Sequence, residues 1–255
     1  MVQLTKIIRM SEIAKNIKLV EEKILKACSK RSPEFENIKP RLVAVSKIKP
    51  ASLIIDAYEA GQKYFGENYV NELVDKSNHP DILTRDIRWH FIGHLQRNKV
   101  NKVLSVPNLF MIETVDNDKL ATAINSSWQK YRKQDDHKIN VMVQVNTSNE
   151  PEKSGCKIEE TSALVKHILE NCKNLKFSGL MTIGAYGYDP SNGPNPDFLS
   201  LKKCREIVSN ELSLDINNIE LSMGMSTDYE HAIELGSTNV RVGSAIFGER
   251  PPKTL

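Results

Sequence analysis

The segment 41-RLVAVSKIKP-50 decides how the rest of the chain is interpreted. Residues Leu42 to Val45 are apolar without interruption, as in a short strand that is buried on both faces. The run continues into Ser46 and Lys47, and Pro50 marks its exit into a turn. Lysine is rarely buried fully, and a desolvated amine loses its proton more readily and becomes a nucleophile. The segment therefore predicts a core strand that ends on a reactive amine or, alternatively, on a lysine that extends to solvent.

The pattern of this segment recurs along the chain. We expect strands at 41–47, 64–68, 88–93, 109–114, 139–146, 177–184, 219–223 and 240–247. Helical patterns lie between them, near 51–61, 69–77, 96–105, 117–132, 158–172, 197–212 and 228–236. Such alternation predicts parallel strands joined by helices, and eight units favour a (β/α)8 TIM barrel. An open doubly wound sheet is the alternative, but "SKIKP" lacks the Gly-rich turn that normally follows its first strand.

The chain of 255 residues is expected to form a single α/β domain over 1–255. Apolar residues recur at threes and fours from Leu4 to Lys30, which predicts a helix before the first strand. This helix and its lead-in occupy 1–40, and the barrel occupies 41–250. The Pro- and Gly-rich stretch 186–197 follows the sixth predicted strand and is expected to be a long loop at the carboxyl end of the barrel.

Composition excludes several classes of function. A net charge of +3 with 26% charged residues gives no indication of a nucleic-acid or membrane partner. The four cysteines form no C-x-x-C pair and have no metal-ligand spacing, so we expect reduced thiols, no metal and a cytoplasmic location. The basic N-terminus could also be a mitochondrial presequence, but Glu12, Glu21 and Glu22 weigh against it. No run approaches the roughly 18 apolar residues of a membrane span.

Polar residues recur where the predicted strands end. Asn68 follows the second strand, His90 lies in the third, and Ser222 and Met223 end the seventh. Each alone is more simply a residue of the core that satisfies its own hydrogen bonds. Their joint position at one end of the barrel, where active sites lie, indicates a ligand site.

The last two units predict a phosphate site. The seventh reads 221-LSMGMSTDYEHAI-233, in which Gly224 allows a close backbone approach and Ser226 offers a hydroxyl group. The eighth reads 240-VRVGSAIFG-248, with Gly243 and Ser244 after Arg241. Barrels often bind phosphate with the loops after strands seven and eight. Ordinary turn and capping chemistry is the alternative for either loop, but the two together favour a phosphate.

A reactive lysine beside a phosphate site suggests an aldehyde that carries a phosphate group. Pyridoxal 5′-phosphate (PLP) is such a molecule, and a phosphorylated sugar on a Schiff-base aldolase is the rival.

The sequence resembles the family of PLP homeostasis proteins, which are alanine-racemase N-terminal-domain-like, fold-type III PLP-binding proteins. The resemblance rests on "VAVSKIKP", "FGENYVNE", "WHFIGHLQRNK", "VQVNTS", "KSGC", "GLMTIG", "LSMGMSTDYEHAI" and "VRVGSAIFG", which span about four fifths of the chain. It implies that Lys47 holds PLP as a Schiff base and that Ser226, Gly243 and Ser244 hold the phosphate. It also implies that Arg241 faces the pyridine nitrogen, unless Arg241 pairs with Glu220 or Glu234. The residues implied to line the ring are Asn68, His90, Ser222 and Met223.

The resemblance further implies a role in intracellular PLP homeostasis (vitamin B6 metabolism) rather than catalysis. Alanine racemases of this fold add a C-terminal β domain whose tyrosine, from the partner subunit, is the second base, and this sequence ends at Leu255. We therefore expect a monomer that binds PLP and passes it to PLP-requiring apo-enzymes. A weak PLP-dependent amino-acid racemase is the alternative. Arg241 has only donors and cannot accept a proton from the pyridine nitrogen, so the ring should be a poor carbanion sink.

Overall fold

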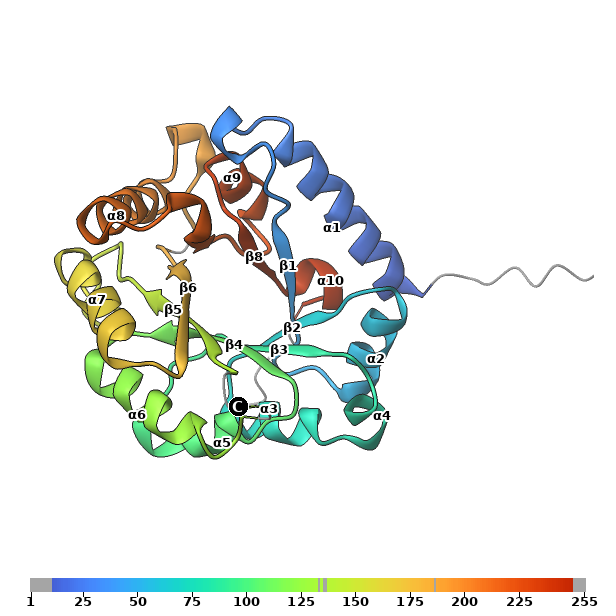
Figure 1. Ribbon diagram of the computed structural model, residues 1–255. Helices are drawn as coiled ribbons and strands as arrows, with labels where there is room; N and C mark the ends of the chain where they lie inside the picture. The colour runs from blue at the N-terminus through green and yellow to red at the C-terminus, as the bar shows by residue number, and fades with distance from the viewer. Residues whose placement is uncertain (1–10, 133, 135–136, 186, 250–255) are drawn as a thin grey trace, which may run out of the picture.

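Residues 11–132, 134, 137–185 and 187–249 are described by the computed structural model. Within them, parallel strands pair in chain order, and β8 pairs with β1 to close a barrel. The strands are β1 Arg41–Val45, β2 Tyr64–Glu67, β3 Arg88–Phe91, β4 Leu109–Val115, β5 Ile139–Gln144, β6 Leu175–Met181, β7 Glu220–Ser222 and β8 Asn239–Val242. Figure 1 shows these strands at the centre with the helices around them. The predicted (β/α)8 barrel is confirmed, and the open sheet is wrong.

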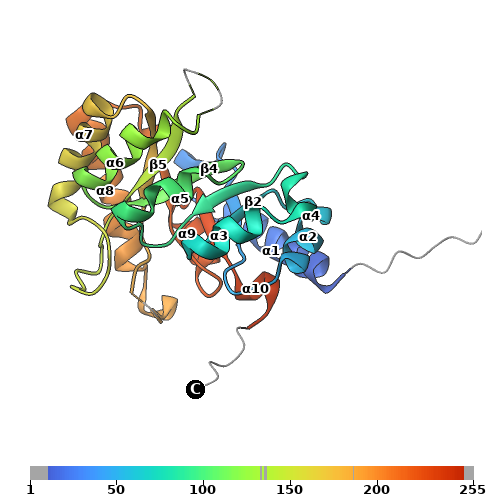
Figure 2. The same ribbon diagram turned by 90° about the horizontal axis from the view of Figure 1, so that it is seen from below.

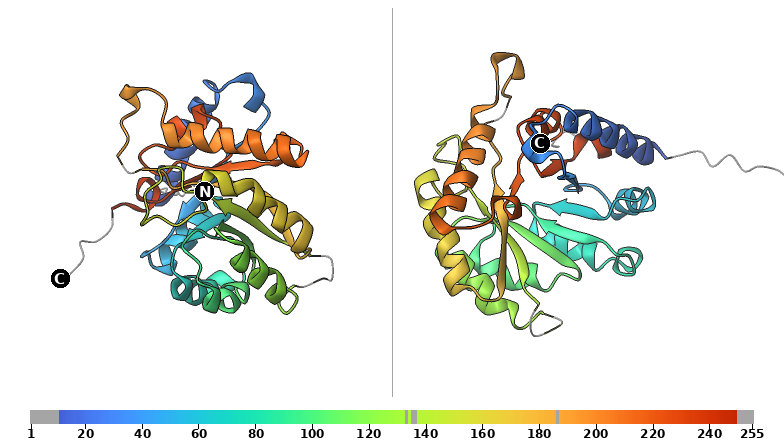
Figure 3. Two further views of the ribbon diagram at one scale, coloured as in Figure 1. Left: turned by 90° about the vertical axis from the view of Figure 1, so that its left-hand side faces the viewer. Right: turned by 45° about the horizontal axis from the view of Figure 1, so that its top comes forward.

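A helix lies in each predicted helical segment, and two short helices are additional. The helices are α1 Glu12–Cys28, α2 Ala51–Glu59, α3 Val70–Ser77, α4 Pro80–Leu83, α5 Val100–Leu104, α6 Asp118–Trp128, α7 Thr161–Asn171, α8 Pro196–Leu212, α9 Tyr229–Glu234 and α10 Ser244–Phe247, of which α4 and α10 are the additional ones. Figure 3 shows α7 and α8 side by side along the outer wall. Figure 2 shows the loops after β5 and β6 and the helix α10 at one end of the barrel, which is the carboxyl end of the strands.

Helix α1 takes the place of an eighth outer helix. The helix after β8 is only α10, four residues long, and α1 packs against α9, α10 and α2 outside β8 and β1 (Figure 1). The buried face of α1 includes Ile13, Ile17, Val20 and Ile24, at the spacing of an amphipathic helix. The Asn16 amide adds a hydrogen bond of 3.0 Å to the Ile246 carbonyl. The N-terminal helix thus completes the barrel wall.

The two faces of the barrel wall differ in chemistry. Residues such as Leu42 and Ala44 of β1 belong to the large apolar core between strands and helices. Inside the barrel, Met111, Met142 and Met181 form a small separate cluster. Much of the remaining interior consists of buried polar side chains, which belong to the site described below.

Several predicted boundaries need correction. Strands β3, β5 and β6 end at Phe91, Gln144 and Met181 rather than at residues 93, 146 and 184. The eighth and first strands and the N-terminal helix also differ. The eighth strand ends at Val242 rather than residue 247, because the Ser226 hydroxyl accepts the N–H groups of Gly243 and Ala245 and helix α10 begins there. The first strand ends at Val45, so Lys47 lies in the following turn. The N-terminal helix starts at Glu12, where the Ser11 side chain accepts the Ala14 N–H group. Residues 4–10 of that prediction lie outside the described part of the chain.

Candidate functional site

Lys47 lies at the centre of a tight turn at the carboxyl end of β1. The Lys49 N–H group donates to the Ser46 carbonyl at 3.0 Å, which closes the turn around Lys47 and Ile48. Lys47 is half-buried, whereas Ser46 beside it is fully buried. Lys47 therefore lies at the carboxyl end of β1, the position that the sequence predicts for a reactive lysine.

The loops after β1, β7 and β8 meet at this end. The Ser226 hydroxyl of the β7 loop accepts the N–H groups of Gly243, at 2.9 Å, and of Ala245, at 3.4 Å. A Cβ atom added to Gly243 would lie 3.3 Å from the Val45 carbonyl of β1, so glycine suits this close approach. The Lys49 ammonium donates to the Gly248 carbonyl at 3.0 Å. The Ser226 hydroxyl and the backbone N–H groups after β8 thus lie close to Val45, which is two residues before Lys47 in the chain.

The structure gives a packing reason for Gly224. Its φ is +95°, and an added Cβ atom would lie 2.6 Å from the Ala232 Cβ and 2.9 Å from the Tyr229 Cα of α9. Glycine is therefore required here by its positive φ and by the close packing of α9 against the β7 loop.

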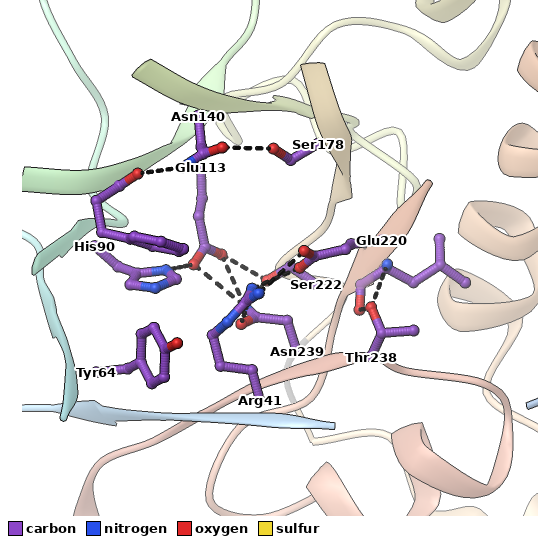
Figure 4. A network of polar contacts seen from close by, with 12 residues as sticks. Arg41, Tyr64, His90, Glu113, Asn140, Ser178, Glu220, Ser222, Thr238 and Asn239 are labelled. Atoms are coloured by element: carbon purple, nitrogen blue, oxygen red, sulfur yellow. Dashed lines mark hydrogen bonds and ion pairs between the residues drawn. The ribbon is translucent and has the colours of Figure 1, made fainter. Parts of the chain in front are cut away.

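A charged network fills part of the barrel interior beneath the mouth (Figure 4). Glu113 of β4 is fully buried and accepts hydrogen bonds from His90 Nδ1 at 2.5 Å and from the Ser222 hydroxyl at 2.6 Å. The Asn239 amide donates to both carboxylate oxygens, at 3.2 and 3.3 Å. Burial opposes ionisation, but the His90 hydrogen bond and the nearby charges of His90 and Arg241 outweigh it and lower the pKa of Glu113 to about 2. Glu113 is therefore a buried anion, which the sequence analysis missed.

Arg241 lies above this anion and is bound by neutral acceptors. Its guanidinium group donates to the Ser222 hydroxyl at 2.5 Å and to the Thr182 carbonyl at 2.7 Å. Burial lowers the pKa of Arg241, against the opposing charges of Glu113 and Asp228. Ser222 thus connects cation and anion, because its hydroxyl accepts from Arg241 and donates to Glu113.

The two carboxylates that could have neutralised Arg241 are bound elsewhere. Glu220 pairs with Arg41 at 2.5 Å, at the amino end of β7 and β1. Glu234 pairs with Lys30 on the outer surface at 2.7 Å. The alternative pairing of Arg241 with Glu220 or Glu234 is therefore wrong.

The ring-lining candidates fall into different environments. His90 and Ser222 are fully buried in the network, and Asn68 is half-buried after β2. The Met223 side chain is buried in the apolar core between strands and helices, not at the mouth. Gly93, which the sequence analysis overlooked, fixes Asn68, because an added Cβ atom would lie 1.9 Å from the Asn68 carbonyl oxygen. Ser244 is exposed at the start of α10.

Two of the proposed ring-lining residues carry a buried polar atom without a hydrogen-bond partner. The atoms are Nε2 of His90 and Oδ1 of Asn68. Unpaired buried polar atoms carry a desolvation cost and are uncommon, and a bound polar molecule would remove that cost. The residues present therefore fit a ligand with a phosphate group and polar ring substituents.

Lys47 does not line either of two open surface grooves. One of about 260 Å³ is lined by Asn68, Tyr69, Val70, Asn71, His94, Gln96 and Lys99. A second, of about 500 Å³, lies between the loops after β3 and β4 and includes His94, Arg97 and Lys119. We assign the candidate site to the junction of the β1, β7 and β8 loops, since hydroxyl and N–H donors converge there and not in the larger groove.

Neither a metal-type cluster nor a membrane-spanning helix is found in the described part of the chain. Among the described residues, no three His, Cys, Asp or Glu side chains are grouped as a metal site would require. No described helix has both the length and the apolar character that crossing a membrane requires.

A parallel barrel with a lysine, a hydroxyl group and an arginine at the carboxyl ends of its strands is typical of a (β/α)8 ligand-binding protein. The sequence profile of the family described as alanine racemase, N-terminal domain, matches residues 8–251. The chain therefore belongs to this family.

Relatives and solved structures agree with this assignment. The chain is 54% identical over 236 residues to the pyridoxal phosphate homeostasis protein of Homo sapiens, covering 92% of this chain and 85% of the relative. It is 39% identical over 241 residues to the protein of the same name from Haemophilus influenzae, covering 93% and 96%. The PipY structure from Synechococcus elongatus without PLP has a TM-score of 0.76 at 28% identity and covers 92% of this chain and all of PipY. PipY with PLP bound has a TM-score of 0.74. Alanine racemase from Corynebacterium glutamicum, at 13% identity and a TM-score of 0.68, shares the fold.

Proposed function

We propose that this protein binds pyridoxal 5′-phosphate, holds it covalently on Lys47 and contributes to intracellular PLP homeostasis. The observation that carries the proposal is the junction of three loops, where the Lys47 turn adjoins the Ser226 hydroxyl and the Gly243 backbone. The names of the relatives from Homo sapiens and Haemophilus influenzae and the PLP-bound PipY structure support the same reading.

Each part of the site has a defined task in this proposal. Ser226, Gly243 and Ser244 hold the phosphate group through hydroxyl and backbone N–H donors, which form strong charge-assisted hydrogen bonds. PLP supplies an aldehyde, which condenses with a primary amine to an imine. Lys47 supplies that amine.

Arg241 sets the electronic character of the bound ring. We place it against the pyridine nitrogen, with Asn68, His90 and Ser222 around the ring and Met223 contributing at most its backbone. The Ser222 hydroxyl and the Thr182 carbonyl orient the guanidinium group, and Glu113 compensates its charge through Ser222. A permanent cation with donors only leaves the nitrogen unprotonated. This suits a protein that stores PLP without consuming amino acids.

The remaining parts of the proposal concern partners and location. We also propose that the protein is a monomer that delivers PLP to PLP-requiring apo-enzymes. A sedimentation coefficient of a dimer would contradict the monomer. The four cysteines are unpaired, which supports a reducing compartment such as the cytoplasm. A fluorescent fusion that accumulates in mitochondria would overturn that location.

Borohydride reduction followed by mass spectrometry tests the proposal directly. We expect one PLP adduct, on Lys47, and none in Lys47→Ala. Lys49→Ala is the matched control, because Lys49 lies in the same turn but contacts the carbonyls of Gly248 and Glu249. The control should retain the adduct. An adduct on Lys49 or Lys153 would refute the assignment of Lys47.

Deuterium exchange at the α carbon separates a carrier from a weak racemase. The PLP-loaded protein, incubated with α-deuterated alanine, should lose no deuterium beyond the rate of free PLP. Rapid loss together with racemisation would show an enzyme instead.

A further inference from the structure

The turn that presents Lys47 contains a strained residue. Ile48 has a φ of +63°, in the left-handed region that β-branched side chains rarely adopt. Glycine usually occupies this position when a tight turn requires a positive φ. The Ile48 side chain is 44% exposed, so tight packing does not hold it in place. Such a conformation persists only when the surrounding groups enforce it.

Three charged side chains of β2 and α3 contact this turn, and we call them the Glu67–Glu72–Lys76 cluster. The Lys76 ammonium donates to the Ser46 carbonyl at 2.8 Å, to Glu67 Oε1 at 2.8 Å and to Glu72 Oε2 at 2.7 Å. An ammonium group has three N–H donors, and these contacts use all of them.

The same cluster binds the turn at two further atoms. Glu72 Oε2 accepts the N–H group of Ile48 itself at 2.8 Å. Glu67 Oε1 accepts the Ser46 hydroxyl at 2.7 Å. The cluster therefore binds the turn at three groups, all from one side. These are the Ser46 carbonyl, the Ser46 hydroxyl and the Ile48 N–H group.

Stability alone does not account for this cluster. Glu67 is fully buried, and its Oε2 atom has no hydrogen-bond partner. Burial raises the pKa of Glu67 in spite of the Lys76 charge and the hydrogen bonds from Lys76 and Ser46. Apolar replacements of buried ion pairs are often as stable or more stable. The contacts of the cluster with the Ser46–Lys49 turn thus explain its presence better than its contribution to folding stability does.

We infer that the Glu67–Glu72–Lys76 cluster positions Lys47, by locking the Ser46–Lys49 turn in the conformation that presents the amine to an aldehyde at the mouth. The inference rests on the proposed function of Lys47. The three residues are positioning residues, since they contact the turn and not the reacting atoms.

Two readouts separate positioning from pocket integrity. Covalent attachment of PLP is measured by borohydride trapping and mass spectrometry. Affinity for the pocket is measured with pyridoxine 5′-phosphate, which has an alcohol in place of the aldehyde and cannot form the bond. Lys76→Met should lower the extent of attachment by roughly tenfold or more, because the strained turn relaxes. Its affinity for pyridoxine 5′-phosphate should stay at the wild-type value. Asp75→Asn, an exposed residue of the same helix, is the matched control and should change neither.

A second substitution tests the role of strain. Glycine adopts a positive φ without cost, so Ile48→Gly in the Lys76→Met background should restore attachment to near the wild-type level. If Lys76 only stabilised the fold, Ile48→Gly would not restore attachment of PLP. If Lys76→Met does not fold, Glu72→Gln with and without Ile48→Gly decides the question, because Glu72 is the least buried member of the cluster.

The outcomes are distinct. Undiminished attachment in both Lys76→Met and Glu72→Gln, with a normal Lys47 adduct in the wild type, would overturn this inference alone. A parallel loss of attachment and of pyridoxine 5′-phosphate affinity, without rescue by glycine, would also overturn it. Absence of any Lys47 adduct in the wild type would overturn the proposed function and this inference together.

Discussion

Replacement of Glu113 by glutamine should reveal how strongly the buried anion stabilises the barrel. The pKa of Glu113 is lowered from its ordinary value of 4.5 to about 2, so folding favours its charged form. A shift of this size corresponds to about 3 kcal/mol of stability at neutral pH. Breaking a buried ion pair costs a similar amount, about 3–5 kcal/mol, and without Glu113 the buried Arg241 would face only the charge of Asp228. We therefore expect Glu113→Gln to lower the free energy of unfolding by about 3 kcal/mol or more.

The pH dependence of that difference is the sharper test. Because the pKa is lower in the folded state, the contribution of Glu113 is complete above its ordinary pKa and is lost as the pH falls toward 2. Urea denaturation of both proteins should show a constant difference from pH 7 to about 5 and a difference smaller by roughly 1 kcal/mol at pH 3.5. Glu59→Gln is the control, because Glu59 is 63% exposed in its pair with Arg85 and should cost less than about 1 kcal/mol. A Glu113→Gln variant as stable as this control, or a difference that ignores pH, would refute the reasoning.

Three further outcomes are expected. Ser226→Ala should weaken PLP binding by about 10- to 100-fold and leave the affinity for pyridoxal unchanged. Thr227→Ala, at an exposed neighbour, is the control and should change neither affinity. Equal losses for PLP and pyridoxal would refute the placement of the phosphate group at this loop. Gly93→Ala should cost about 1–3 kcal/mol in thermal or urea unfolding, because its Cβ atom would lie 1.9 Å from the Asn68 carbonyl oxygen. A near-neutral result would contradict that close approach. Burial raises the pKa of Cys156 to about 12 and of Cys204 to about 11, and it also raises the pKa of Cys172. Only Cys28 should therefore react rapidly with a disulfide reagent in the native protein. Two rapidly reacting thiols would contradict this.

The barrel could be predicted because its signals are local. Each apolar run and each helical repeat lies within about ten residues, and their alternation leaves few arrangements for parallel strands. Element ends were less predictable. Val240 to Phe247 is apolar enough for one strand, but the Ser226 hydroxyl, from another loop, captures the N–H groups that would have continued it.

The candidate site was predictable where its residues follow strands. Asn68, Ser226 and Gly243 could be placed at one end of the barrel because parallel strands all point the same way. Met223 could not, since whether a residue at a strand end faces the mouth or the outer core depends on register. Gly224 has the positive φ of a turn, but only the packing of α9 shows which atoms a side chain would meet.

The sequence by itself determined the order of strands and helices and the Lys47 segment at the end of the first strand. These depend on hydrogen bonding and side-chain alternation between near neighbours in the chain. Only the tertiary structure decided that Ser222 connects Glu113 to Arg241. The hydrogen bond from Lys76 to the Ser46 carbonyl of the Lys47 turn was likewise decided only there. The sequence around a charged residue does not indicate which distant residue it will pair with. Closure and register of the barrel bring such distant charges together, and the cost of burying an unpaired charge makes the pairing obligatory.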